Sequence, residues 1–194
     1  MMNVRRMLAV CAGSCAMVLA APVVAQQQSP ELQSPWGIYV EGGNTLEGNS
    51  KAGVASAGFT FGFGPRRELW GGVVTTFGDL FVSEWRAQRR SNDRKQNYTQ
   101  VGIIANARYR FAQGTSPWFA DLGIGLTLLD KLYETPDRSF STRFQFTEVL
   151  GIGRSFGDTG AHELQLRVQH VSNAGIKEPN PGETFFKLRY QYHF

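Results

Sequence analysis

The chain has 194 residues, of which 42% are hydrophobic, 12% aromatic and 19% charged, and it contains 22 glycines. This composition excludes a disordered chain, a collagen and a coiled coil, and the length suits one domain with a packed core. The formal net charge of +4 is small, so the sequence predicts no nucleic-acid partner.

The first 25 residues have the layout of a secretory signal peptide. Arg5-Arg6 precede an apolar run, and Val23-Val24-Ala25 offers a small-residue cleavage site. We therefore expect residues 1–25 to be removed and residues 26–194 to form a single domain.

Removal of this signal changes both the charge and the cysteine content. The remaining chain has 18 basic and 16 acidic residues, a net charge of +2, and it loses both Cys11 and Cys15. Neither a disulfide nor a thiolate metal site is therefore expected in the mature domain, and no cofactor is predicted.

After the signal, no stretch approaches the roughly 18 consecutive apolar residues that a membrane-spanning helix needs. Several segments instead alternate apolar with small or polar residues, as in 101–111 and 118–128. Period two is typical of β-strands. We expect eight strands, near 36–43, 53–63, 68–85, 97–111, 117–129, 139–156, 162–172 and 184–194.

The connections between these strands alternate in length. They are short at 64–67, 112–116 and 157–160, and longer and polar after the first, third, fifth and seventh strands. This asymmetry, the even strand number and an aromatic terminal Phe194 favour an all-β, eight-stranded antiparallel transmembrane β-barrel of the outer-membrane type. The alternative is a soluble β-sandwich, in which the apolar face would point inward.

A basic segment follows the third expected strand. Five cations lie within ten positions: Arg86, Arg89, Arg90, Arg94 and Lys95. In the barrel, this loop would be extracellular, where guanidinium groups could contact lipopolysaccharide phosphates. A solvated loop is an equal alternative, because Glu84 and Asp93 interrupt the basic residues.

The seventh strand carries the candidate catalytic residues. Its apolar face, Leu164, Leu166 and Val168, is continued by His170 and Ser172, since residues i and i+2 point the same way on a strand. In a barrel, that face looks at lipid, where polar groups are costly and call for a functional reason. The alternative is a His and a Ser that merely sit at the membrane interface.

The segment from His170 through Lys177, followed by 179–182, resembles the C-terminal motif of the PagL family, the lipid A 3-O-deacylases of the Gram-negative outer membrane. The resemblance is specific over 166–182 and weaker elsewhere. It implies an eight-stranded barrel with a Ser/His/acid triad on its lipid-facing surface. By this resemblance, Ser172 is the nucleophile, His170 is the general base, and Asn173 and Gly175 stabilise the oxyanion through a side-chain amide and a backbone N–H.

The third triad member departs from the family pattern. Counted from His170, the family's acid falls on Thr184, whereas an acid stands one place earlier at Glu183. Alternation points Glu183 inward, so its assignment requires a bulge or a shortened loop that turns it outward. Glu178 in the loop and Glu148 on the preceding strand's outward face are the alternatives, and we expect Glu183.

The sequence therefore predicts a carboxylic ester hydrolase that removes the 3-O-linked acyl chain of lipid A in the outer leaflet, in the outer membrane of a Gram-negative bacterium. The alternatives are a non-catalytic structural or adhesive barrel and a lipid A acyltransferase. The oligomeric state is left open, a homodimer included. His162 and His193 are expected to be structural or solvated.

Overall fold

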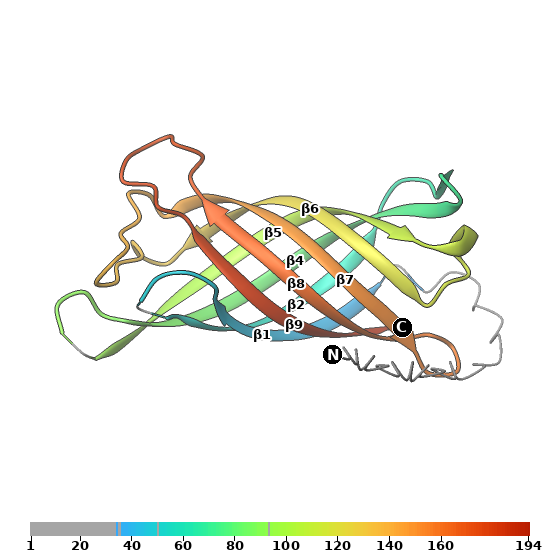
Figure 1. The fold of residues 1–194 in the computed structure, drawn as a ribbon, viewed down its shortest axis with the longest axis horizontal. Helices are drawn as coiled ribbons and strands as arrows, with labels where there is room; N and C mark the ends of the chain where they lie inside the picture. Colours follow the sequence, from blue (N-terminus) through green and yellow to red (C-terminus); the bar gives the residue numbers. More distant parts are fainter. Residues whose placement is uncertain (1–33, 35, 50, 93) are drawn as a thin grey trace, which may run out of the picture.

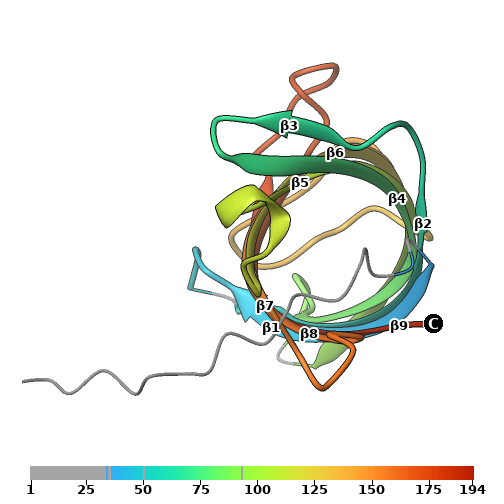
Figure 2. The ribbon, with the colours of Figure 1, turned by 90° about the vertical axis from the view of Figure 1, so that its right-hand side faces the viewer.

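The protein forms one antiparallel β-sheet that closes on itself (Figures 1 and 2). The structure is a computed structural model and describes residues 34, 36–49, 51–92 and 94–194. The expected signal peptide, 1–25, lies outside the described residues. The described strands are β1 Gly37–Thr45, β2 Gly53–Gly62, β3 Arg67–Leu69, β4 Gly72–Gln88, β5 Lys95–Arg110, β6 Trp118–Leu129, β7 Phe144–Phe156, β8 His162–Ser172 and β9 Glu183–His193.

Closure is made by two pairings between strands that are not consecutive in the chain. β1 pairs with β9, and β2 pairs with β4, so the ring runs β1, β2, β4, β5, β6, β7, β8, β9. The three-residue β3 pairs only with β4 and stands apart from the wall. The predicted eight-stranded antiparallel barrel is confirmed. No helix in the described part of the chain is long and apolar enough to cross a bilayer.

Two sequence-based boundaries are wrong. The link after β2 is not a four-residue turn, because Trp70 and Gly71, both with positive φ, close a β3–β4 hairpin there. The sequence also predicts a strand that starts near residue 139, but β7 begins at Phe144. Residues 139–143 belong to the 130–143 loop, whose Phe140 is buried inside the barrel.

The alternation of side chains gives the wall an apolar outside and a charged inside. Large aliphatic side chains point outward and are about half exposed, among them Leu122, Ile124, Leu150, Ile152, Leu166 and Leu188. The interior is filled by ion pairs. Glu41 binds Lys187 at 2.9 Å and Arg189 at 2.8 Å, and Arg189 also binds Asp79 at 2.9 Å. A closed wall of this kind has its apolar surface toward lipid.

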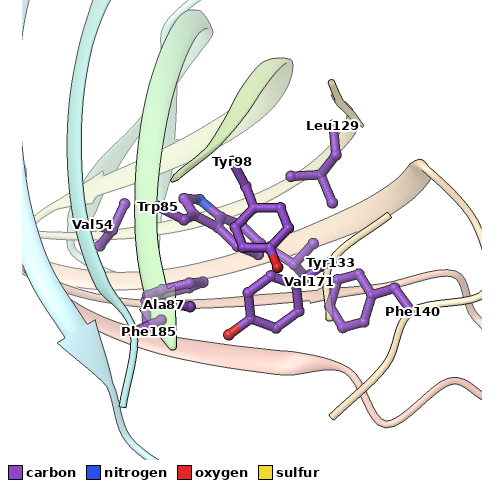
Figure 3. Close-up of a cluster of buried hydrophobic side chains, with 10 residues drawn as sticks. Val54, Trp85, Ala87, Tyr98, Leu129, Tyr133, Phe140, Val171 and Phe185 are labelled. Atoms are coloured by element: carbon purple, nitrogen blue, oxygen red, sulfur yellow. The ribbon is translucent and has the colours of Figure 1, made fainter. Parts of the chain in front are cut away.

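The connections divide between the two ends of the barrel (Figure 1). One end, here called the loop end, carries 46–52, 89–94, 130–143 and 173–182. At this end, the 130–143 loop folds into the barrel mouth, where Tyr133 and Phe140 pack against Trp85 (Figure 3). These buried aromatic rings fill the mouth and support the loops above it.

The outward orientation of Ile124 gives a test of the lipid-facing wall. Ile124 lies midway along β6 and is 62% exposed. Ile124→Arg should lower the free energy of unfolding in lipid vesicles by roughly 2–4 kcal/mol, because a charge near the bilayer midplane is desolvated. Ile124→Met, which keeps the volume without charge, should change it little. Equal losses for the two variants in urea titrations would mean that Ile124 does not face lipid.

Candidate active site

Three polar side chains stand on the outer wall where β8 and β9 approach the loop end. His170 and Ser172 are two residues apart on β8, and both are half-buried on its outward side. Thr184 on β9 is the register partner of His170. The uninterrupted antiparallel pairing of these strands therefore brings a hydroxyl, an imidazole and a second hydroxyl together on one face.

Thr184 and Gly182 fix the position of the His170 ring. The ring atom Nδ1 lies 2.9 Å from the Thr184 Oγ1. Gly182 has φ +63° and lies so close that a Cβ there would be 2.6 Å from the His170 Cε1 and 3.0 Å from Nε2. Only glycine fits this combination of a left-handed backbone and a close approach. The ring is thus held between a hydrogen bond on Nδ1 and a backbone surface beside Nε2.

The expected acid Glu183 does not reach His170. β8 and β9 pair without the bulge that its assignment required, so Glu183 faces Val171 and its side chain lies inside the barrel, 1% exposed. There it accepts the Tyr133 hydroxyl at 3.0 Å and lies 3.8 Å from the Arg138 guanidinium. The expectation that Glu183 turns outward is therefore wrong, because side-chain alternation continues unbroken to the first residue of β9.

Tyr133 is a suitable donor for this buried carboxylate. Burial and the neighbouring Glu183 charge raise the pKa of the Tyr133 phenol well above its usual value. The phenol therefore keeps its proton and donates a hydrogen bond to Glu183. This pair ties the 130–143 loop to the start of β9, and its contribution to the site is structural.

The two alternative acids occupy different surroundings. Glu178 is exposed in the 173–182 loop, where its Oε2 accepts the backbone N–H of Asn180 at 2.8 Å. Glu148 is exposed on the outward face of β7 and is the register partner of His170 on that side. Of the three acids weighed from the sequence, only Glu148 shares the wall with His170.

The two expected oxyanion donors are engaged with the loop in this structure. The Asn173 amide donates to the Ser141 Oγ at 3.0 Å and to the Lys177 carbonyl at 2.7 Å. The Gly175 N–H donates to the Asn173 Oδ1 at 2.9 Å. Asn173 is 1% exposed, and its hydrogen bonds hold the 173–182 loop in shape. These bonds assign Asn173 a structural part that the motif alone did not reveal.

Arg138 connects the loop end to the site. Its Nη1 donates to the Gly182 carbonyl at 2.7 Å, and its Nη2 lies 3.2 Å from the Glu47 carboxylate. The segment that touches the His170 ring is thereby braced by the 130–143 loop. Neither Arg138 nor Tyr133 was singled out from the sequence, since no local pattern shows that a long loop folds back into the barrel.

The remaining sequence candidates lie away from this group. His162 stands at the opposite end of β8, where its Nδ1 lies 2.8 Å from the Tyr190 hydroxyl, and His193 points inward with its Nε2 3.2 Å from Glu163. The basic residues of the β4–β5 hairpin are mostly exposed, and Arg89 donates to the Gln96 side chain at 2.8 Å.

Comparisons with known proteins converge on one family. A family model described as lipid A 3-O-deacylase (PagL) matches residues 51–193. A "Lipid A deacylase PagL" of Bordetella bronchiseptica is 39% identical over 77 residues, which are 40% of this chain and 42% of that protein. A protein of the same name from Pseudomonas aeruginosa is 29% identical over 83 residues, 43% of this chain and 46% of that protein. The chain thus spans less than half the length of the curated relatives it matches.

The fold resembles that of a solved structure. It is described as the crystal structure of the outer membrane enzyme PagL, and it superposes with a TM-score of 0.66 at 19% sequence identity. The superposition covers 80% of this chain and 98% of that chain. At this identity, the likeness concerns the fold.

The opposite orientations of residues 183 and 184 can be tested by cysteine labelling. Cys11 and Cys15 are the two cysteines of the sequence. Labelling of the unsubstituted protein therefore measures the background signal. In detergent micelles, a lipophilic maleimide should modify Thr184→Cys and leave Glu183→Cys unmodified until the barrel is denatured. Rapid modification of Glu183→Cys in the folded protein would contradict the register of β8 and β9.

Proposed function

Because the chain belongs to the lipid A 3-O-deacylase (PagL) family, we propose that it hydrolyses the 3-O-linked acyl ester of lipid A, with Ser172 as the nucleophile and His170 as the general base. The substrate is lipopolysaccharide in the outer leaflet, and the protein works in the outer membrane of a Gram-negative bacterium. The loop end then faces the cell exterior.

This proposal rests on the position of His170 and Ser172 in the barrel wall. They stand on the apolar outer wall, where a polar pair costs free energy unless it has a function. A substrate whose acyl chains already lie in the leaflet reaches this wall by lateral diffusion. A water-soluble ester would have to enter the bilayer first, so the location selects a lipid.

The apolar surroundings of Ser172 suit acyl chains. Its register partner on β7 is Phe146, whose ring lies 5.3 Å from that of Phe144. Phe144 also borders an apolar groove of about 510 Å³ that continues over β6, β5 and β4, between Leu128, Val101 and Leu80 among others. Acyl chains lying along this wall would direct the ester toward Ser172.

The chemistry follows from the two ring nitrogens of His170. A proton on Nδ1, donated to the Thr184 Oγ1, leaves the Nε2 lone pair free to act as a base. Nε2 takes the Ser172 proton as Oγ attacks the ester carbonyl carbon, and it then gives that proton to the departing sugar oxygen. Water next attacks the acyl-serine and loses its proton to the His170 Nε2, which passes that proton to the departing Ser172 Oγ as the fatty acid is released.

Thr184 is the residue in this scheme that the sequence did not nominate. It occupies the position of the family's acid and holds the imidazole, but it carries no charge. Asn173 and Gly175 remain the proposed oxyanion donors, and the substrate would have to replace the loop bonds that both now make. The basic β4–β5 hairpin would lie at the height of the lipopolysaccharide phosphates.

Mass spectrometry of lipid A from cells that express the protein tests this function. Loss of one hydroxyacyl chain is expected. Ser172→Ala and His170→Asn should each abolish this loss, and the double variant should be no worse, because the two residues act as a unit. Ser91→Ala, in the exposed β4–β5 loop, is the matched serine control and should stay active.

The other outcomes decide between the alternatives. Gain of a chain would indicate an acyltransferase, and an unchanged lipid A would favour the non-catalytic barrel. Full activity of a correctly folded Ser172→Ala variant would overturn the nucleophile. Heat-modifiable gel mobility, the sign of an intact barrel, should be the same for every variant, because both side chains lie outside the barrel.

A further inference from the structure

Glu148 is a carboxylate on the outer wall, and its neighbours along β7 and on β6 are apolar. Its outward neighbours along β7 are Phe146 and Leu150, and its register partner on β6 is Ile124. An ionised group on the lipid face of a barrel is destabilising, and more so with depth. Its presence there therefore calls for a compensating function.

Another outward carboxylate, Glu84 on β4, has an ordinary explanation. Its Oε2 accepts the Thr99 hydroxyl at 2.9 Å, and the next outward residue toward the loop end is Arg86. Glu84 thus belongs to a polar border at the loop end. Glu148 accepts no hydrogen bond from any residue that the structure describes, so no such border accounts for it.

The neighbour that can account for Glu148 is His170. The two are register partners on β7 and β8 and share the outward face, which places their Cβ atoms about 4.5–5.5 Å apart. On the other side of His170, β9 offers the uncharged Thr184 and Phe186. The nearby loops carry Glu178 and Arg138, but Arg138 is committed to the Gly182 carbonyl and to Glu47.

A triad acid has two tasks, which are to orient the imidazole and to stabilise the positive charge that forms on it. The Thr184 hydroxyl meets Nδ1 at 2.9 Å and can perform only the first task. We propose that Glu148 performs the second task and stabilises the His170 imidazolium across the strand pair. Thr184 on β9 then orients the imidazole and Glu148 on β7 stabilises its charge, two tasks that a single acid performs in a triad.

This assignment rests on the proposed function, and it needs no direct hydrogen bond. In a medium of low dielectric constant, a charge acts over several ångströms with little screening. The proton still moves from the Ser172 Oγ to the His170 Nε2 and then to the leaving oxygen. Glu148 gains and loses no proton in these steps and acts only through the charge on His170.

The charge on His170 exists only while the reaction proceeds, so Glu148 should affect kcat and leave KM nearly unchanged. We expect Glu148→Gln to lower kcat on purified lipid A in mixed micelles by roughly 10- to 1,000-fold. This loss is smaller than the ~10⁴-fold loss that follows when a triad acid is removed and orientation is lost as well. Glu84→Gln, the same change elsewhere on the wall, should leave both constants unchanged.

A rescue experiment separates charge from structure. Thr184→Glu places a carboxylate where the family has its acid, so the Glu148→Gln/Thr184→Glu double variant should recover most of the lost kcat. Glu148→Asp, which keeps the charge, should remain closer to the parent than Glu148→Gln. Gel mobility confirms that each variant is folded.

Three results would overturn the assignment of Glu148: an unchanged kcat in Glu148→Gln, an equal loss in Glu84→Gln, or no recovery in the double variant. Ser172→Ala, measured in the same micelles, distinguishes a failure of the Glu148 assignment from a failure of the proposed function. If Ser172→Ala is inactive while Glu148→Gln equals the parent, only the role of Glu148 is wrong. If Ser172→Ala is fully active, the proposed nucleophile is wrong, and if the parent protein itself removes no acyl chain, the proposed function is wrong.

Discussion

The alternation of side chains across a closed, bulge-free wall is the constraint on which every other feature depends. Because the β7–β8 and β8–β9 pairings are uninterrupted, Glu148, His170, Ser172 and Thr184 all face outward. The same register sends Glu183 inward, although it is the neighbour of Thr184 in sequence. A shift of one residue at the start of β9 would exchange the two, giving His170 a carboxylate and leaving a threonine beside Tyr133.

The inside of the barrel supports this outer site. An apolar exterior leaves the interior to charged groups, and these are paired across the barrel, as between Arg108, Asp121 and Glu163. Breaking such a buried pair is strongly destabilising, so the pairs favour one fixed wall. At the loop end, Tyr133 and the other aromatic rings fill the mouth, and Arg138 extends this support to Gly182. The site is thus an outer surface backed by a packed interior.

The fold and the outward placement of His170 and Ser172 could be predicted from the sequence because both depend on period two. Alternation along 162–172 is enough to place His170 and Ser172 on the apolar face, and connection lengths separate the barrel's two ends. The expectation that a bulge turns Glu183 outward is wrong, because side chains alternate without interruption from the first residue of β9. Tyr133 and Arg138 could not be predicted, since long-range contacts of a loop leave no local pattern. The hydrogen bonds of Asn173 also depend on the position of Ser141, which is 32 residues away in sequence.

We propose that Ser172 on the outer wall is a nucleophile activated by His170. The most direct test is covalent trapping with a fluorophosphonate that carries an acyl-like chain, applied to the barrel in lipid vesicles and followed by peptide mass spectrometry. A serine hydroxyl with an adjacent base reacts with such a reagent, whereas ordinary serines do not. We expect one adduct, on the peptide that contains Ser172, and its loss in His170→Asn. An adduct on another serine, or an adduct at Ser172 that persists in His170→Asn, would contradict it.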